Sequence, residues 1–220
     1  MSSVISTFVA AAQRLFGPLG AHDGLGEEPL AEAEARLRLR LPKALREVYR
    51  VSGLRADLHA SHNRLLAPDE LALEDDVLVF YEEHDRHMLW GMRVAELGQA
   101  NPEVVISPGT PPLRWSSEAQ PLTSFLASML LVQRMSVPPW VLKRKVGQAL
   151  LEQFEGLYPR LEVFGRVGES ARWFGEDGHL VRVEGKVPSA VVTVAAPSRE
   201  ALMALGERLE ITWSDADWAG

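Results

Sequence analysis

Cysteine is absent from this 220-residue chain. Without it the protein has no disulfide framework, no thiol nucleophile and no cysteine-ligated zinc site, which fits a reducing compartment. Long apolar runs are missing as well, because polar side chains interrupt the longest one, residues 122–135. These side chains are Thr123, Ser124, Ser128, Gln133 and Arg134. A bilayer-spanning helix needs roughly 20 apolar residues, so we expect no membrane segment.

The chain also lacks a positively charged start. No lysine or arginine precedes the first apolar residues, Val4 and Ile5, so the opening does not resemble a secretory signal peptide. Together with the missing membrane segment, this predicts a soluble cytoplasmic protein.

Basic residues are fewer than acidic ones. The chain has 23 Lys and Arg against 30 Asp and Glu, a net charge of −7. Direct nucleic-acid binding needs clustered basic residues for the phosphates, so this balance argues against it. It permits a basic partner, but mild acidity also serves solubility alone, and net charge by itself does not separate the two interpretations.

Apolar periodicity divides the sequence into helical and extended segments. Residues 30–41 carry one apolar stripe at helical spacing, and Pro42 is suited to begin the next helix, with Leu45 and Tyr49 facing inward and Ser52-Gly53 as its stop. Further helices are expected at residues 4–16, 125–133, 141–157 and 198–208, with Thr123 or Ser124 and Ser198 as the caps of the helices that follow them. A short helix is expected to start at residues 68–71. Runs of β-forming residues predict strands at 77–81, 88–92, 104–106, 113–115, 161–164, 172–174, 180–183, 190–194 and 209–213. This order predicts an α+β protein.

Two consecutive prolines, Pro138 and Pro139, mark the expected domain boundary. They end the preceding helix and stiffen the connection. We therefore predict a first domain at residues 1–136 and a smaller helix-plus-strands module at residues 140–220.

Residues 30–132 resemble the SUKH superfamily, which includes bacterial immunity proteins against polymorphic toxins and a fungal regulator of cell-wall synthesis. The resemblance lies in the order and spacing of several short blocks rather than in any one of them. The blocks are Glu34; Leu41-Pro42 with Leu45 and Tyr49; Ser52-Gly53; Asn63-Arg64-Leu65-Leu66; Pro68-Asp69-Glu70-Leu71; Val79-Phe80-Tyr81-Glu82-Glu83; Trp90-Gly91; Asn101-Pro102-Glu103-Val104; and Leu122 with Phe125.

The resemblance implies a twisted antiparallel sheet with packed helices, which acts by binding another protein. It brings no catalytic residue and no cofactor to carry over, so we expect a protein that is not an enzyme. Two features depart from the pattern. The usual glycine of the first hairpin is missing from residues 83–87, and residues 137–220 lie outside the match.

A run of acids is the clearest candidate for a partner-binding site. Between Leu65 and Asp85 no lysine or arginine occurs. The acids are Asp69, Glu70, Glu74, Asp75, Asp76, Glu82, Glu83 and Asp85. One interpretation is a negative surface that attracts a basic partner, such as a toxin nuclease. The other is a solvated helix end and turn.

Other patterns indicate a metal or phosphate site only weakly. His84 with His87 and His59 with His62 repeat a three-residue spacing, but a zinc site needs three or four fixed ligands, so we expect polar loop histidines and no metal. Residues 24–26 repeat glycine without the strand that a phosphate-binding loop requires. Three functions therefore remain: an immunity protein that blocks a toxin, a regulatory module for a housekeeping partner, and an uncharacterised enzyme.

Overall fold

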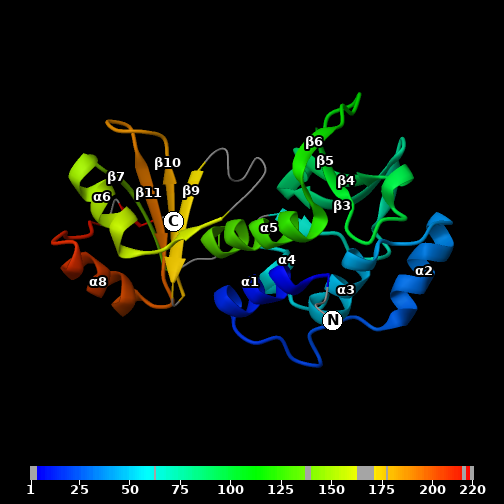
Figure 1. Ribbon diagram of the computed structural model, residues 1–220, viewed down its shortest axis with the longest axis horizontal. Coiled ribbons are helices and arrows are strands. Elements are labelled where there is room, and N and C mark those ends of the chain that lie inside the picture. The colour runs from blue at the N-terminus through cyan, green and yellow to red at the C-terminus, as the bar shows by residue number, and fades with distance from the viewer. Residues whose placement is uncertain are drawn as a thin grey trace. The chain divides into compact units, whose positions relative to one another are not determined.

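The computed structural model describes residues 4–61, 63–136, 140–162, 171–176, 178–214 and 217–218. Helices and antiparallel sheets make it an α+β protein, as predicted (Figure 1). The chain divides into two compact units, Met1–Gln133 and Arg134–Gly220. The prolines at the expected boundary lie outside the described residues, so the independent folding of the two parts stays a prediction. Within the described chain, no helix has both the length and the apolar character needed to cross a membrane.

One antiparallel sheet forms the centre of the first unit. Its strands follow the order β1-β3-β4-β5-β6, and β2 lies beside β3. The bounds are β1 Asn63–Leu65, β2 Ala72–Glu74, β3 Val77–Glu83, β4 Met88–Arg93, β5 Glu103–Pro108 and β6 Ser116–Pro121. Strands β1 and β2 were not predicted, since each has only three residues and lies in a mostly polar stretch.

Helices α1 to α4 are drawn below this sheet in Figure 1, and α5 starts at its lower edge. Their bounds are α1 Ser6–Phe16, α2 Glu27–Leu37, α3 Lys43–Ser52, α4 Ala56–His59 and α5 Leu122–Ser136, with short 3₁₀ turns at His84–Arg86 and Val94–Glu96. Phe125 of α5 packs edge-on against Tyr81 and Phe80, with ring centroids 5.3 and 5.7 Å apart. Leu45 and Tyr49 are buried, which confirms the predicted inward face of α3.

The hairpin between β3 and β4 turns without glycine. Asp85 and Arg86 both adopt left-handed backbone conformations, with φ of 62° and 59°. Aspartate tolerates this region better than most residues, because its short side chain bonds locally. The hairpin therefore turns on two residues in a conformation that glycine normally provides.

The second unit contains a five-stranded antiparallel sheet, and its described residues include helices α6 and α8. The strand order is β7-β11-β10-β9-β8. The bounds are β7 Val141–Lys145, α6 Gln148–Leu157, β8 Arg160–Leu161, β9 Ala171–Glu176, β10 His179–Glu184, β11 Val191–Ala195 and α8 Arg199–Arg208. Both helices pack on one face, where Phe154 and Leu202 join Val181 and Val192 in a buried cluster (Figure 1). The Ser198 hydroxyl accepts from the N–H of Ala201 at 3.2 Å, the predicted cap.

The predicted helix over residues 141–157 is wrong in its first part. Residues 141–145 form β7, and α6 begins only after Gly147. Leu142 and Val146, which are both buried, are four residues apart and share one face in a helix and in a strand alike. Pairing with β11 decides between the two possibilities in favour of the strand.

Two predicted strands are also wrong. Residues 209–213 do not extend, because Glu210 is left-handed with φ of 54° and the N–H of Ile211 turns back to the carbonyl of Gly206. Residues 113–115 precede β6 instead of forming a strand, and the N–H of Arg114 bonds to the hydroxyl of Ser107 at 2.8 Å. Of the strand expected at 161–164, Leu161 belongs to β8, whereas residues 163 and 164 lie outside the described chain.

Several boundaries shift without changing the element. Helix α5 begins at Leu122, ahead of the expected caps Thr123 and Ser124, and extends to Ser136. The helix start expected at residues 68–71 is wrong: residues 68–70 form a turn, in which the Glu70 carboxylate accepts from the N–H of Ala67 at 2.9 Å.

Candidate functional site

The acids of the predicted partner-binding run differ widely in exposure. Five are exposed, namely Asp69, Glu70, Asp75, Asp76 and Asp85. Glu74 and Glu83 are half-buried, and Glu82 is buried with only 5% of its surface exposed. The expectation that Glu82 faces solvent together with Glu83 and Asp85 is therefore wrong for Glu82.

Arginines adjacent to the run in sequence explain the burial of Glu82. In the β1–β3 pairing Arg64 lies opposite Glu82, and its Nε donates to Glu82 Oε1 at 2.8 Å. Arg86, just after the run, returns from the hairpin with its Nη1 3.3 Å from Glu82 Oε2. The sequence places both arginines immediately outside the acidic segment, and antiparallel pairing brings them onto it.

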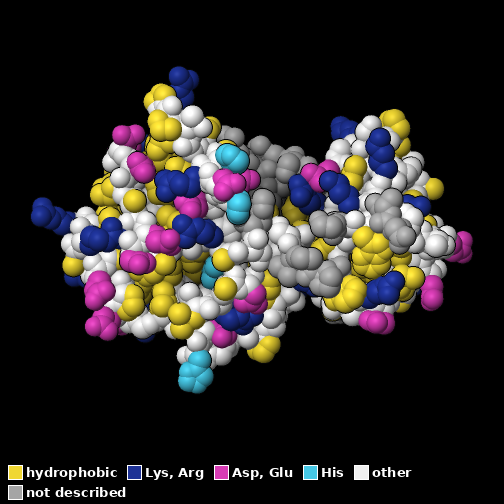
Figure 2. Space-filling view, turned by 180° about the vertical axis from the view of Figure 1, so that it is seen from behind, with side chains coloured by type: hydrophobic (Ala, Val, Ile, Leu, Met, Phe, Trp, Pro, Cys, Tyr) yellow, Lys and Arg dark blue, Asp and Glu magenta, His cyan; other side chains and the backbone are white. Residues whose placement is uncertain are grey.

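Further ion pairs link the acids of the run to arginines. Arg64 also donates to both carboxylate oxygens of Glu70 at 2.7 Å, a hydrogen bond that holds the pKa of Glu70 below its usual value. Arg93 lies 3.2 Å from Asp76, and Arg86 lies 3.7 Å from Glu74. Figure 2 shows acidic and basic side chains interleaved over the face it draws. The run is therefore partly neutralised, although the first unit as a whole keeps most of the net negative charge.

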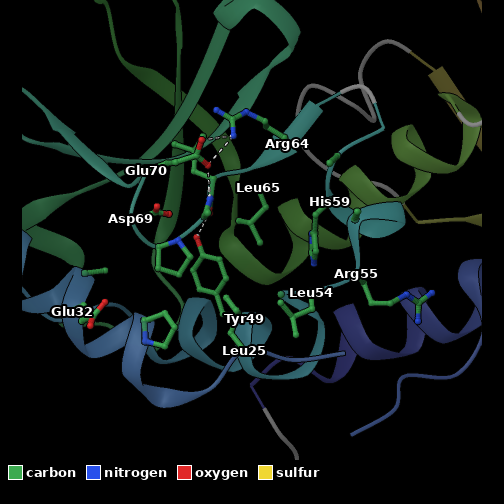
Figure 3. A pocket seen from close by; sticks show the side chains of 18 of the residues that line it. Leu25, Glu32, Tyr49, Leu54, Arg55, His59, Arg64, Leu65, Asp69 and Glu70 are labelled. Carbon is green, nitrogen blue, oxygen red and sulfur yellow. Dashed lines mark hydrogen bonds and ion pairs between the residues drawn. The ribbon is translucent and has the colours of Figure 1, made fainter. Parts of the chain in front are cut away.

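A groove of about 740 Å³ opens on the first unit beside the start of the acidic run. Its walls are α2, the end of α3, α4, β1 and the loop of residues 66–70 (Figure 3). Tyr49 and Leu65 supply apolar floor, and Leu54 stands at the edge with 60% of its surface exposed. Of the predicted site residues, Asp69 and Glu70 lie in this groove, whereas Asp75, Asp76 and Asp85 do not line it.

Two buried polar side chains fix the floor. The hydroxyl of Tyr49 donates to the carbonyl of Leu66, and burial raises the pKa of Tyr49 well above its usual range. His59 stacks on Phe8 with ring centroids 6.1 Å apart, and burial lowers the pKa of His59 to about 4. Both side chains are therefore uncharged near neutral pH and hold the floor by packing and hydrogen bonds.

Ser52 contacts His59 but does not reach the groove. Its hydroxyl donates to the carbonyl of Val48 at 2.9 Å, which leaves the oxygen to accept from His59 Nε2 at 3.0 Å. Ser52 has no exposed surface. The pair therefore ties α3 to α4 and positions the wall of the groove.

Charged side chains around the groove are held in place by specific partners. Arg36 donates to the carbonyls of Pro68 and Leu71 at 3.0 and 2.9 Å, which joins α2 to the loop. Arg55 donates to Asp57 at 2.8 Å and lies 3.2 Å from Asp23. These contacts make the rim rigid rather than a set of free surface charges.

The weaker sequence motifs have structural roles. Gly24 lies so close to α3 that a Cβ would stand 1.6 Å from the carbonyl oxygen of Arg50, and the N–H of Leu25 donates to Tyr49 O at 2.8 Å. This loop therefore packs against a helix end. His84 pairs with Asp85 at 3.0 Å, and the described residues contain no group of three or more potential metal ligands. His62 lies outside the described residues.

Sequence reasoning missed the groove. Its walls come from segments that are separated by loops without a distinctive motif, and α4 and β1 fall in a stretch interpreted as a polar loop. The one available signal was Leu54, an apolar residue directly after the predicted helix stop at Gly53.

Comparison with known proteins gives no relative: no family model, curated protein or solved structure matches this chain.

Proposed function

We propose that this chain is a non-catalytic binding protein of the SUKH immunity type, which neutralises a cognate bacterial toxin by occupying its surface. The sequence resemblance in residues 30–132 supports the family, and the α+β architecture agrees with the class that the family implies. The groove of the first unit is the proposed docking surface.

The observation that carries the proposal is the apolar floor of the groove together with exposed Leu54. Among the described residues, Leu54 is the most exposed of the large apolar side chains. A leucine in this position gains free energy when a partner covers it, at about 25 cal/mol per Å² of apolar surface removed from water. Protein interfaces typically place such residues at their centre, within a rim of polar groups.

The geometry also fits occlusion better than enclosure of a small ligand. The groove is open and borders five segments of the first unit, so a partner contacts helix, strand and loop together. Its volume is large enough for one or two anchor side chains, the usual pattern of a protein interface.

The test is capture of the partner from the native host followed by neutralisation. Wild-type chain, Leu54→Asp and Met203→Asp are used as baits, and captured proteins are identified by mass spectrometry. Met203 is the matched control, because it lies on α8 of the second unit and 44% of its surface is exposed. We expect one protein to be captured by wild type and Met203→Asp but lost with Leu54→Asp.

The captured protein is then expressed alone and together with each variant. An immunity function requires that the protein stops growth when alone, and that wild type and Met203→Asp restore growth while Leu54→Asp does not. A captured protein that is harmless would instead support a regulatory module for a housekeeping partner. Equal capture by Leu54→Asp would show that the groove is not the docking surface.

A further inference from the structure

We propose that the groove receives a cationic side chain of the partner, arginine or lysine, between Glu32 of α2 and Asp69 of the 66–70 loop, with the aliphatic stem on the apolar floor. This inference rests on the proposed binding function and names the chemistry of the partner. Figure 3 shows the two carboxylates on opposite walls at the same end of the groove.

Both carboxylates are available to a partner. Glu32 and Asp69 are exposed, and within the described part of the chain neither has an ion-pair partner. Their neighbour Arg36 directs its guanidinium to the backbone carbonyls of Pro68 and Leu71. Two carboxylates and one guanidinium leave this end of the groove with an excess of negative charge.

The other two arginines of the rim are already paired with carboxylates. Arg55 lies between Asp23 and Asp57, and Arg64 contacts both Glu70 and Glu82. All three rim arginines thus have partners, backbone carbonyls for Arg36 and carboxylates for Arg55 and Arg64, which leaves Glu32 and Asp69 as the unpaired charges among the described residues of the groove. An incoming anion would meet guanidinium groups whose hydrogen bonds are in use, whereas an incoming cation meets free carboxylate oxygens.

The apolar floor selects the form of the cation. A lysine or arginine carries a charged head on an aliphatic stem, so it places the head at the carboxylates and the stem on apolar surface. Leu25 and Pro29, which line the groove and are half-buried, offer that surface, and the buried ring of Tyr49 closes the groove behind them with its hydroxyl bonded to Leu66 O. Arginine is also a frequent anchor of protein interfaces, where it fills a pocket in the partner.

The test uses a library of random dodecapeptides displayed on phage and selected on the immobilised full-length chain. We expect the selected peptides to contain an arginine or lysine next to an apolar residue. Synthetic versions are then measured by fluorescence polarisation against wild type, Glu32→Gln/Asp69→Asn and a control, Glu28→Gln/Asp75→Asn. The control makes the same change in net charge at two exposed acids that do not line the groove.

The double change in the groove should weaken peptide binding about tenfold at low salt, which is the sum expected for two solvent-accessible ion pairs. The control should change it less than about twofold. The difference should shrink above about 0.1 M salt, where the screening length is near 10 Å.

Selected peptides without basic residues, no enrichment at all, or equal weakening by both double variants would overturn the cationic anchor. Peptides that bind independently of Glu32 and Asp69 but are lost with Leu54→Asp would leave the docking groove in place and refute only the charge assignment. Peptides unaffected by Leu54→Asp would count against the groove itself.

Discussion

Replacing Glu82 by glutamine tests whether this acid belongs to the fold or to the binding surface. The substitution keeps the shape of the side chain and removes its charge. Glu82 is 5% exposed and faces two guanidinium groups, with Arg64 Nε at 2.8 Å and Arg86 Nη1 at 3.3 Å. The structure therefore predicts a loss of folding stability, whereas a solvent-facing acid would show none.

The magnitude follows from the exposure of the partners. Hydrogen bonds to charged groups contribute about 1.5–3 kcal/mol each when buried. The side chains of Arg64 and Arg86 are 43% and 54% exposed, so water takes over part of their solvation when the carboxylate is lost. Arg64 also keeps Glu70. We therefore expect a loss of about 2 kcal/mol, below the 3–5 kcal/mol typical of breaking a fully buried pair.

Urea unfolding followed by circular dichroism measures this loss. Leu45→Ala identifies the transition that belongs to the first unit, since Leu45 is buried there. Asp85→Asn, an exposed acid of the same hairpin, is the control and should stay within about 0.5 kcal/mol of wild type. If Glu82→Gln changes the free energy of unfolding as little as Asp85→Asn, the Glu82 carboxylate is solvated in the folded protein and the ion-pair reasoning is wrong.

Three further predictions concern the first unit. Leu45→Ala should lower the free energy of unfolding by about 2–5 kcal/mol in the same urea experiment, and a loss below about 0.5 kcal/mol would contradict the packing of α3. The lowered pKa of His59, about 4 against an ordinary 6.5, means that the unfolded chain takes up the proton first. The stability that neutral His59 gives is thus fully present above pH 6.5, and the free energy of unfolding falls by about 3 kcal/mol as the pH is lowered toward 4. His59→Leu should remove this pH dependence between pH 6.5 and 4. The same pH dependence in His59→Leu and wild type would contradict the assignment. A chain that ends at Ser136 keeps all of α5 and should unfold cooperatively, whereas a molten product would show that residues 140–220 complete its core.

Long elements with a strong pattern could be predicted from the sequence. Helix α3 was predicted because burial of one face, with Leu45 and Tyr49, leaves a clear apolar period. Most of strand β3 was predicted, over residues 77–81, because burial on both faces leaves a continuous run of apolar β-forming residues. The N-cap at Ser198 was equally local, since one hydroxyl satisfies a nearby N–H. Such features depend on residues close together in the chain.

The remaining features depend on distant pairing. Strand β7 has a four-residue apolar spacing that a helix also satisfies, and only its hydrogen bonds to β11 distinguish the two. The acidic run seemed free of basic residues because Arg64 and Arg86 stand just outside it, and the β1–β3 pairing that returns Arg64 to Glu82 is not visible from local sequence. The groove could not be predicted either, because its walls come from loops and elements whose proximity is set by the folded chain.

The alternation of Arg64, Glu82 and Arg86 also has a consequence for sequence variation. A change of Arg64 to a neutral residue leaves the Glu82 carboxylate buried with one guanidinium fewer, and loss of Glu82 leaves the two guanidinium groups with only their outer partners, Glu70 and Glu74. Either single step is costly, while a paired exchange to uncharged residues is tolerated. Positions 64, 82 and 86 are therefore expected to vary together among related sequences.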